Sequence, residues 1–183
     1  ELRFKPGEKF EYSNTNYFLL AKVIERITKK SFPEFMKAEI FKPLGMENTF
    51  FLEDSKNVLT NYATGYEKIG ENNYQINTTR SSINGASGLI ASLEDFIKWD
   101  ANLRNNILGK EKKQIRNRIV QTANLNDGTK QTYGYGIVVD KYKGLKHISH
   151  AGQFSALTTS YHNFPEQEVS VVLFTNKLNF DVV

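Results

Sequence analysis

The 183-residue chain contains no cysteine. Disulfides, thiol catalysis and zinc–thiolate sites are therefore excluded within it. No apolar run approaches the roughly 20 residues that a transmembrane helix needs, and no signal peptide is visible. The three histidines, at positions 147, 150 and 162, do not have the spacing of a metal-ligand set. The sequence thus predicts no metal and no other cofactor, and it leaves the cellular compartment open.

Charge of one sign is also scarce, because the net charge is only +4 and the lysines and arginines are spread along the chain. One denser basic run, residues 110–118, has no nucleic-acid-binding motif beside it, so we interpret it as a short solvated surface helix and predict no nucleic-acid partner. With 39% hydrophobic and 24% charged residues, the composition is typical of a globular protein. The length fits one domain or a large part of one.

The first third of the chain reads as two helices. Residues 15–30 carry an apolar stripe at helical spacing, and Asn14 is well placed to cap this helix. A second helix is expected from an N-cap at Ser31 to a stop at Pro43. The stripe of the first helix consists of Tyr17, Leu20, Ile24 and Ile27, widened by Leu19 and Val23.

The middle of the chain is mostly loop. Residues 47–80 are polar and weakly periodic, with short strands expected at 63–68 and 74–77. The stretch Ala86-Ser87-Gly88-Leu89 allows tight packing but is not a nucleophile elbow, which needs glycine in place of Leu89; we interpret Ser87 as structural. Ser92 is then expected to cap a third helix, whose buried side would be Phe96, Ile97, Trp99 and Leu103.

The last third is rich in strands joined by short turns. Runs at 133–140, 146–150, 154–164 and 169–175 indicate an antiparallel meander, and the last run is apolar enough to predict a buried strand. Helices followed by strands predict an α+β fold in which helices pack on an antiparallel sheet, within one domain over residues 1–183.

Two stretches carry candidate chemistry. Tyr12 and Asn14 are two residues apart just before a helix, so their side chains are expected to point into one cleft. A phenol transfers protons usefully when cations lower its pKa from about 10. In the other stretch, Ala151 and Gly152 leave the backbone open beside His150, and the N–H of Gln153 is a candidate oxyanion donor. The simpler alternatives are that Asn14 only caps a helix and that His150 is a hydrogen-bonded or surface histidine.

These stretches occur in a recognisable order: Pro6-Gly7, Tyr12-Ser13-Asn14, Pro43-Leu44-Gly45-Met46, Ala86-Ser87-Gly88-Leu89 and His150-Ala151-Gly152. The pattern resembles the superfamily of serine β-lactamases and penicillin-binding proteins. It is most similar to the branch with class C β-lactamases, D-alanyl-D-alanine carboxypeptidases, D-aminopeptidases and esterases. The resemblance implies a β-lactamase/transpeptidase-like fold and a small-molecule or peptidoglycan-like substrate. It also suggests a periplasmic or cell-envelope location.

The resemblance also implies an acyl-enzyme mechanism. Tyr12 matches the tyrosine that shuttles a proton between nucleophile and leaving group, and Asn14 matches the asparagine that holds the catalytic lysine and binds the substrate amide. His150 matches the first residue of the family's Lys-Thr-Gly or His-x-Gly strand, which helps to orient the substrate. Gly152 and Gln153 match the oxyanion side of that strand.

The chain departs from the family pattern at the nucleophile. No serine or threonine has a lysine three residues later, so the Ser-x-x-Lys motif is missing. We therefore expect a partial domain that lacks the nucleophile-bearing N-terminal segment and the C-terminal helix, and that is inactive alone. His150 in place of lysine favours ester or D-amino-acid amide substrates over β-lactams. The alternatives are a non-catalytic binding or scaffold relative, and an unrelated α+β protein in which Tyr12 and His150 lie far apart.

Overall fold

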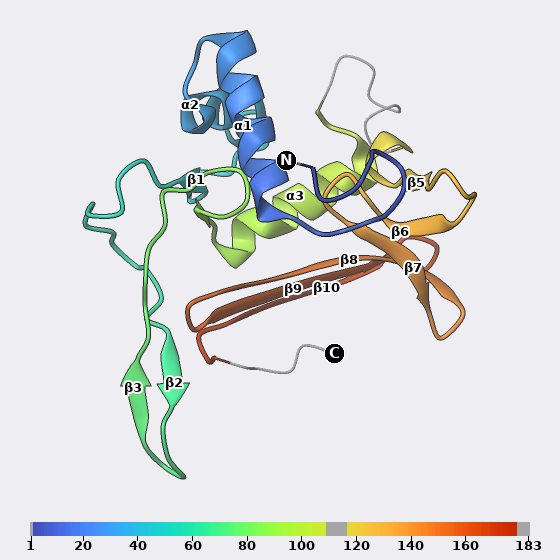
Figure 1. Ribbon diagram of the computed structural model, residues 1–183. Coiled ribbons are helices and arrows are strands. Elements are labelled where there is room, and N and C mark those ends of the chain that lie inside the picture. Colours follow the sequence, from blue (N-terminus) through green and yellow to red (C-terminus); the bar gives the residue numbers. More distant parts are fainter. Residues whose placement is uncertain (1, 109–116, 179–183) are drawn as a thin grey trace.

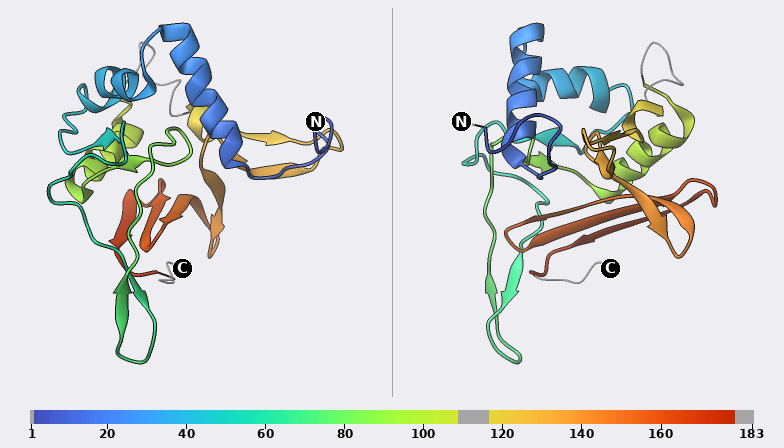
Figure 2. Two further views of the ribbon diagram at one scale, coloured as in Figure 1. Left: turned by 60° about the vertical axis from the view of Figure 1, so that its left-hand side comes forward. Right: turned by 45° about the vertical axis from the view of Figure 1, so that its right-hand side comes forward.

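A six-stranded antiparallel sheet dominates the computed structural model, which describes residues 2–108 and 117–178 (Figure 1). The spatial order β10-β9-β8-β7-β6-β5 is a plain meander, so the predicted topology and the α+β class are confirmed. The helices lie on one face of this sheet, with α3 closest to it (Figure 2). The strands are β5 (Thr122–Asn124), β6 (Lys130–Gly134), β7 (Val138–Tyr142), β8 (Leu145–Phe154), β9 (Leu157–Phe164) and β10 (Val169–Thr175).

The run at 133–140, expected as one strand, is divided between β6 and β7. Tyr133 pairs with Val138, and residues 135–137 form the bend between them. Gly136 has φ +84°, a left-handed conformation that glycine adopts without strain. A Cβ on Gly134 would lie 2.2 Å from the carbonyl oxygen of Gln121. The two glycines therefore permit a sharp turn where strand propensity alone predicted continuity.

β8 and β9 are longer and closer together than the sequence suggested. β8 continues through Phe154 and is joined to β9 by the two-residue turn Ser155-Ala156. The predicted strand at 169–175 is confirmed, but its predicted burial is wrong: β10 is an edge strand, and the side chains of Val169 and Val171 are 49% and 52% exposed. Strand propensity therefore identified the element without identifying its place in the sheet.

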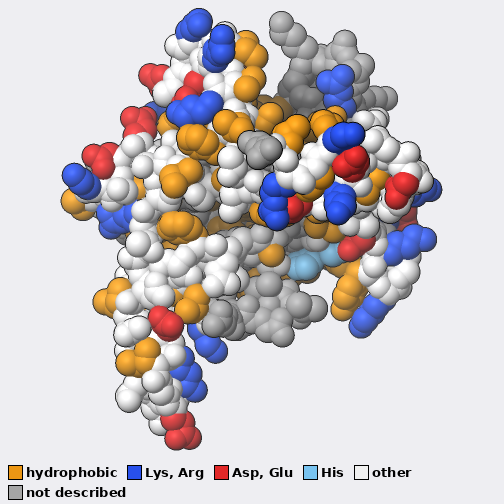
Figure 3. Space-filling model, in the orientation of Figure 1, with side chains coloured by type: hydrophobic (Ala, Val, Ile, Leu, Met, Phe, Trp, Pro, Cys, Tyr) orange, Lys and Arg blue, Asp and Glu red, His pale blue; other side chains and the backbone are white. Residues whose placement is uncertain are grey.

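α1 spans Asn14–Thr28, close to the predicted range. Its N-cap is Ser13 rather than Asn14, and no side chain makes the capping hydrogen bond. Asn14 already belongs to the first turn, so the prediction that it caps the helix is wrong. Only Ala21 is fully buried in α1, while apolar side chains remain exposed along it and are visible over the upper part of the molecule (Figure 3). The exposed set is Leu19, Leu20, Val23 and Ile27.

The second predicted helix is present but changes type. α2 (Phe32–Met36) begins with the expected cap: the side chain of Ser31 accepts from the N–H of Glu34, and Glu34 accepts from the N–H of Ser31. The remaining turns, Lys37–Phe41, are π-helical (η1). Both Phe32 and Phe41 pack on Phe51. The ring centroid of Phe51 lies 4.9 Å from that of Phe32 and 6.1 Å from that of Phe41. Phe51 belongs to the short strand β1 (Phe50–Phe51), which pairs with β4 (Leu89–Ile90).

α3 (Leu93–Asn105) is capped by Ser92 as predicted. It packs on the sheet through Phe96, whose ring lies 5.3 Å from Tyr161 and 5.8 Å from Phe174. Ile97 is 57% exposed, so its predicted burial is wrong. The most buried residues of α3 are instead polar: Asp95, Asp100 and Asn102. Aspartate side chains are usually exposed, and a buried aspartate needs specific hydrogen bonds that replace its contacts with water.

The loop-rich stretch contains the two short strands that were expected, β2 (Tyr66–Lys68) and β3 (Tyr74–Ile76), paired as a hairpin that projects from the body of the molecule (Figure 1). The base of this hairpin is fixed to the β8–β9 turn, because the carbonyl of Asn77 accepts from the Ser155 hydroxyl at 2.8 Å and from the Ala156 N–H at 3.2 Å. The basic run lies mostly outside the described residues; of it, residues 117–118 are helical and exposed. No helix in the described part of the chain is long and apolar enough to cross a membrane.

Gly85, in the central loop, packs closely against α1. A Cβ at this position would lie 2.6 Å from the carbonyl oxygen of Tyr17 and 2.9 Å from the Ala21 side chain, and φ is +105°. Gly85→Ala is therefore expected to lower the free energy of unfolding by about 2–3 kcal/mol, from overpacking and left-handed strain together. Gly144→Ala is the matched control, since Gly144 has φ +85° and open space around it; it should cost only about 1 kcal/mol. Equal losses in urea unfolding would contradict this packing role.

Candidate functional site

The N-terminal segment that carries Tyr12 packs against a turn that lies more than 100 residues later in the sequence. Pro6-Gly7 forms the expected turn, in which Glu8 N–H donates to the Lys5 carbonyl and Gly7 has φ +82°, as a type II turn requires. The Gly7 carbonyl accepts from the N–H of Asn126 at 2.8 Å, and the Asn126 amide donates to the Pro6 carbonyl at 3.2 Å. This contact ties the N-terminal segment to the turn between β5 and β6.

The docked segment places Tyr12 beside His150. Their ring centroids are 6.3 Å apart, although 138 positions separate them in the sequence (150 − 12). The expectation attached to the unrelated-protein interpretation, that these two residues lie far apart, is therefore wrong. Tyr12 is half exposed, so part of this residue can be reached from solvent. Among the described residues, no lysine or arginine forms a hydrogen bond or ion pair with Tyr12.

Asn14 lies two residues further on, at the first position of α1, and is exposed. Because its backbone is already helical, its side chain does not serve the cap. Tyr17 is one turn further along the same helix, and its ring stacks with that of Tyr12 at 6.5 Å. The first turn of α1 and the residue just before its N-cap thus carry the carboxamide of Asn14 and the phenols of Tyr12 and Tyr17.

His150 is on β8 and faces the helices. It pairs in register with Tyr161 of β9, whose hydroxyl donates to Asp100 of α3 at 2.7 Å, so both side chains are on the α3 side of the sheet. Gly152, two residues along, shares this face, and Gln153 points its side chain to the other one. The sheet therefore brings His150 and Gly152 to the same side as Tyr12.

Beyond Ser149, β8 has a free edge. β7 pairs with β8 only as far as Ser149, so in the described part of the chain residues 150–154 have a strand partner, β9, on one edge alone. Backbone N–H groups alternate between the two edges of a strand. Since the Ser155-Ala156 turn closes on Phe154 and Leu157, this alternation directs the N–H of Gln153 to the edge away from β9.

Tyr133 is a residue that sequence reasoning missed. It is half-buried on β6, its hydroxyl lies 3.2 Å from His150 Nε2, and it accepts a hydrogen bond from the Tyr17 hydroxyl at 3.2 Å. Its ring contacts those of Phe10 at 5.5 Å and Tyr12 at 5.7 Å. Burial, followed by the neighbouring Tyr17 and Tyr12 phenols, raises the pKa of Tyr133 well above its usual value. The signal that could have found it is the aromatic Tyr-Gly-Tyr-Gly run, which places a phenol next to two flexible glycines.

The other two histidines lie on the opposite face of the sheet. His147 Nδ1 is 2.7 Å from Asp140, His147 Nε2 is 2.8 Å from His162 Nδ1, and His162 Nε2 is 2.7 Å from the Ser160 hydroxyl. Of the described residues, no group of three or more His, Cys, Asp or Glu side chains is arranged to hold a metal ion. These histidines are therefore separate from the cluster around His150.

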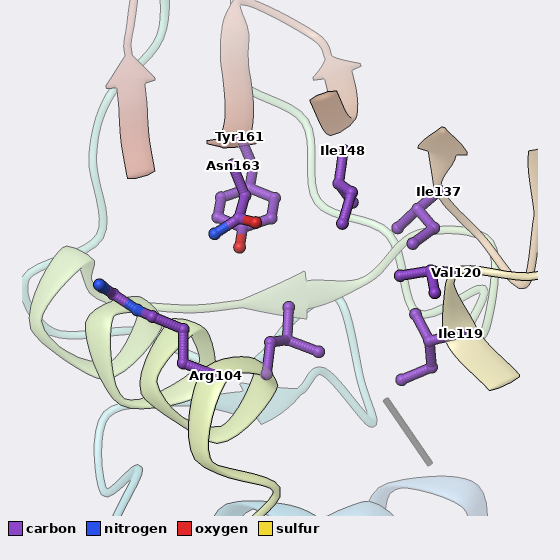
Figure 4. A pocket seen from close by; sticks show the side chains of 8 residues that line it. Arg104, Ile119, Val120, Ile137, Ile148, Tyr161 and Asn163 are labelled. Carbon is purple, nitrogen blue, oxygen red and sulfur yellow. The ribbon is translucent and has the colours of Figure 1, made fainter. Parts of the chain in front are cut away.

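A small, mostly apolar cavity lies between α3 and the sheet (Figure 4). Its volume of about 20 Å³ has room for one water molecule and no substrate. It is lined by Leu103, Arg104, Ile119, Val120, Ile137, Ile148, Tyr161 and Asn163. The open edge of β8 beside Tyr12 and His150 is thus the better candidate for substrate binding.

The arrangement offers a phenol, an imidazole, a carboxamide and an open strand edge, but no activated nucleophile. Ser87 donates to the carbonyl of Ile83 at 3.1 Å within its own loop, which agrees with a structural role. These groups can orient a carbonyl compound and move a proton.

The fold is that of β-lactamases and penicillin-binding proteins. The octameric penicillin-binding protein homologue from Pyrococcus abyssi superimposes with a TM-score of 0.79 at 26% identity, over 97% of this chain and 41% of that one. D-amino acid amidase from Ochrobactrum anthropi, in complex with L-phenylalanine amide, gives a TM-score of 0.75 at 22% identity, over 94% of this chain and 52% of that one. The second likeness, at this identity, concerns the fold alone.

The chain belongs to the Beta-lactamase family, whose sequence profile matches residues 1–182. D-aminopeptidase from Gluconobacter oxydans is 25% identical over 178 residues, and D-aminopeptidase from Brucella anthropi is 26% identical over 173 residues. These alignments cover 97% and 94% of this chain but only 33% and 32% of the relatives. The chain therefore spans about a third of the length of the curated relatives that it matches, and it corresponds to the C-terminal part of the family domain.

Proposed function

We propose that this chain supplies the proton-transfer and substrate-orienting half of a serine hydrolase that works through an acyl-enzyme. The observation that carries the proposal is the approach of Tyr12 to His150, at 6.3 Å between ring centroids, beside the open edge of β8. Residues 1–183 then form one partial domain. The segment with the Ser-x-x-Lys motif completes the site by bringing a serine and a lysine to Tyr12 and Asn14.

In the proposed reaction the serine hydroxyl attacks the substrate carbonyl while the lysine accepts its proton. The negative charge that forms on the carbonyl oxygen is stabilised by the N–H of Gln153 and by the N–H of the serine itself. Tyr12 relays the proton that the lysine took from the serine to the leaving nitrogen or oxygen as the tetrahedral intermediate collapses, so that the lysine and the phenol both return to their starting states. Water then attacks the ester carbonyl and releases the acid, and the serine recovers its proton.

The substrate class proposed here is a D-amino-acid amide, a short peptide with a D-residue or a small ester. One observation supports it: relatives that align with nearly the whole chain are D-aminopeptidases. The resemblance of His150-Ala151-Gly152 to the family's His-x-Gly strand, in place of Lys-Thr-Gly, favours the same class. β-Lactam turnover and peptidoglycan fragments remain secondary candidates on this view. A non-catalytic binding or scaffold protein is the alternative function, and it would retain the fold without a complete nucleophile segment.

Covalent labelling tests the proposal. The 183-residue chain is expected to keep its mass of 21.0 kDa after incubation with a fluorophosphonate or a β-lactam, because it has no Ser-x-x-Lys serine. The same chain extended with the parent protein's upstream segment should gain one adduct. Its variant with alanine in place of the motif serine should gain none. The measurement is intact-protein mass spectrometry.

Two results would contradict the proposal. An adduct on the 183-residue chain would require a different nucleophile within it. An extended chain that folds, as judged by circular dichroism, but gains no adduct and hydrolyses no D-amino-acid amide would favour the binding or scaffold alternative.

A further inference from the structure

Tyr133 connects two parts of the site that come from different ends of the chain. Tyr17 is on α1, Tyr133 on β6 and His150 on β8, and their polar atoms form a chain with two contacts of 3.2 Å: Tyr17 hydroxyl to Tyr133 hydroxyl, and Tyr133 hydroxyl to His150 Nε2. Ring packing accompanies these hydrogen bonds, since the Tyr133 ring lies edge-on against the His150 ring with centroids 5.9 Å apart. Tyr12 lies against both rings, at 5.7 and 6.3 Å.

The two hydrogen bonds share the single hydrogen of Tyr133. A phenol has one O–H to donate and lone pairs to accept with. In the arrangement in which Tyr17 donates to Tyr133, the Tyr133 hydrogen is available for Nε2 of His150. A neutral imidazole has one protonated and one unprotonated nitrogen, so an accepting Nε2 requires the hydrogen to be on Nδ1. In the opposite arrangement, with His150 Nε2–H as donor, the Tyr133 hydrogen would turn to the phenol oxygen of Tyr17 or Tyr12, so the tautomer of His150 distinguishes the two arrangements.

We propose that Tyr133 is a positioning residue of this site, which donates to His150 Nε2 and thereby holds the imidazole as the neutral, Nδ1-protonated tautomer. The catalytic meaning of this role rests on the function proposed above. His150 then offers a single N–H, at Nδ1, to the substrate. A neutral donor is matched by an uncharged acceptor such as an amide or ester oxygen, so Tyr133 favours such a group at this position over a carboxylate.

Two features of Tyr133 suit this role. Burial and its phenol neighbours raise its pKa, so the group stays protonated and remains a donor throughout the neutral range. The Phe10 ring, 5.5 Å away, supports the Tyr133 ring from the docked N-terminal segment. The same packing therefore holds Tyr12 in place and Tyr133 on His150.

The test is the tautomer of His150 in the folded chain with ¹⁵N-labelled histidine, read from long-range ¹H–¹⁵N NMR spectra at pH about 8.5, two units above the ordinary histidine pKa of about 6.5. His150→Gln assigns the signal by deletion. Wild type is expected to be protonated on Nδ1. Tyr133→Phe should shift the tautomer ratio about fivefold or more towards Nε2–H, the ratio that one hydrogen bond of about 1 kcal/mol corresponds to. Tyr135→Phe removes an exposed phenol from the neighbouring bend and should change nothing.

An Nε2-protonated His150 in wild type, or an unchanged ratio in Tyr133→Phe, would overturn the proposal. The wild-type spectrum decides even if the Phe variant does not fold. In the extended chain that carries Ser-x-x-Lys, Tyr133→Phe should lower kcat for a D-amino-acid amide about tenfold while KM changes less than about twofold; equal kcat values would also overturn it. Failure of the labelling experiment with the expected tautomer would remove the proposed function and leave the His150 assignment intact, so the two failures are distinguishable.

Discussion

Tyr12→Phe is expected to lower kcat/KM by about 10²–10⁴-fold in a form of the protein that carries the Ser-x-x-Lys segment, the range that a positioned general acid–base contributes. The substitution removes one oxygen and keeps the ring that stacks on Tyr17 and contacts Tyr133. Stability should therefore change little, and the loss should appear in kcat rather than in KM. The measurement is steady-state hydrolysis of a D-amino-acid amide.

The matched control is Tyr135→Phe, which deletes a phenol that is 67% exposed and outside the site. Its kcat/KM should be that of wild type. If Tyr12→Phe retained more than about half of the activity, Tyr12 would be a packing residue and the proton would have to come from another group. A rise in KM with kcat unchanged would likewise contradict the assignment, because Tyr12 would then contribute to substrate binding alone.

Asp100→Ala is expected to lower the free energy of unfolding by about 3–5 kcal/mol, as the breaking of a buried charged network does. Asp100 is 2% exposed and accepts hydrogen bonds from the Tyr161 and Ser170 hydroxyls at 2.7 and 2.6 Å, and from Arg104. It is therefore the main polar connection between α3 and strands β9 and β10. Without it, the Tyr161 and Ser170 hydroxyls and the Asn163 amide lose an acceptor in a buried interface, and the partly exposed Arg104 loses its ion pair.

Urea unfolding followed by circular dichroism measures this effect. Asp127→Ala is the control, because Asp127 is exposed and, in the described part of the chain, bonds to Thr129 within its own turn; it should leave the free energy of unfolding nearly unchanged. A loss at Asp100 no larger than that at Asp127 would show that the network is not a stability determinant.

The Asp100 network also makes the free energy of unfolding depend on pH. Burial, the largest single influence, pushes the pKa of Asp100 upwards, but the hydrogen bonds from Ser170, Tyr161 and Arg104 outweigh it and leave the pKa below its usual value. A carboxyl whose pKa is lowered by folding stabilises the protein above its unfolded pKa of about 3.9 and loses this contribution as pH falls through the folded value. The acid limb of the stability curve should therefore be shallower in Asp100→Ala than in wild type.

Local patterns identified most of the elements correctly. The range of α1, the Ser31 and Ser92 caps, the Pro6-Gly7 turn and the strand at 169–175 were all readable, because each depends on periodicity, a capping side chain or a turn residue within a few positions. The motifs built on Tyr12 and His150 likewise identified the family, since they are short, ordered and chemically specific.

Errors arose where distant contacts decide. Whether β10 is buried depends on its being at the edge of the sheet, and Ile97 is exposed because α3 turns buried aspartates towards its partners instead. Nothing near Asp100 in the sequence shows that Tyr161 and Ser170 will supply hydrogen bonds. Burial of a charged group is set by donors that only folding brings together.

The sequence by itself determined the α+β class and the absence of a Ser-x-x-Lys motif, because these follow from local patterns. It also pointed to the family and to Tyr12, Asn14 and His150 as candidates, because its short ordered motifs resemble those of the family. Only the tertiary structure decided that Tyr12 meets His150, that β8 has an open edge beyond Ser149, and that Tyr133 bonds to His150. The meeting of Tyr12 and His150 depends on the docking of an N-terminal turn against Asn126, 120 positions from Pro6 along the chain. The open edge of β8 and the Tyr133 contact depend on the register of neighbouring strands, such as Val138 opposite Ser149.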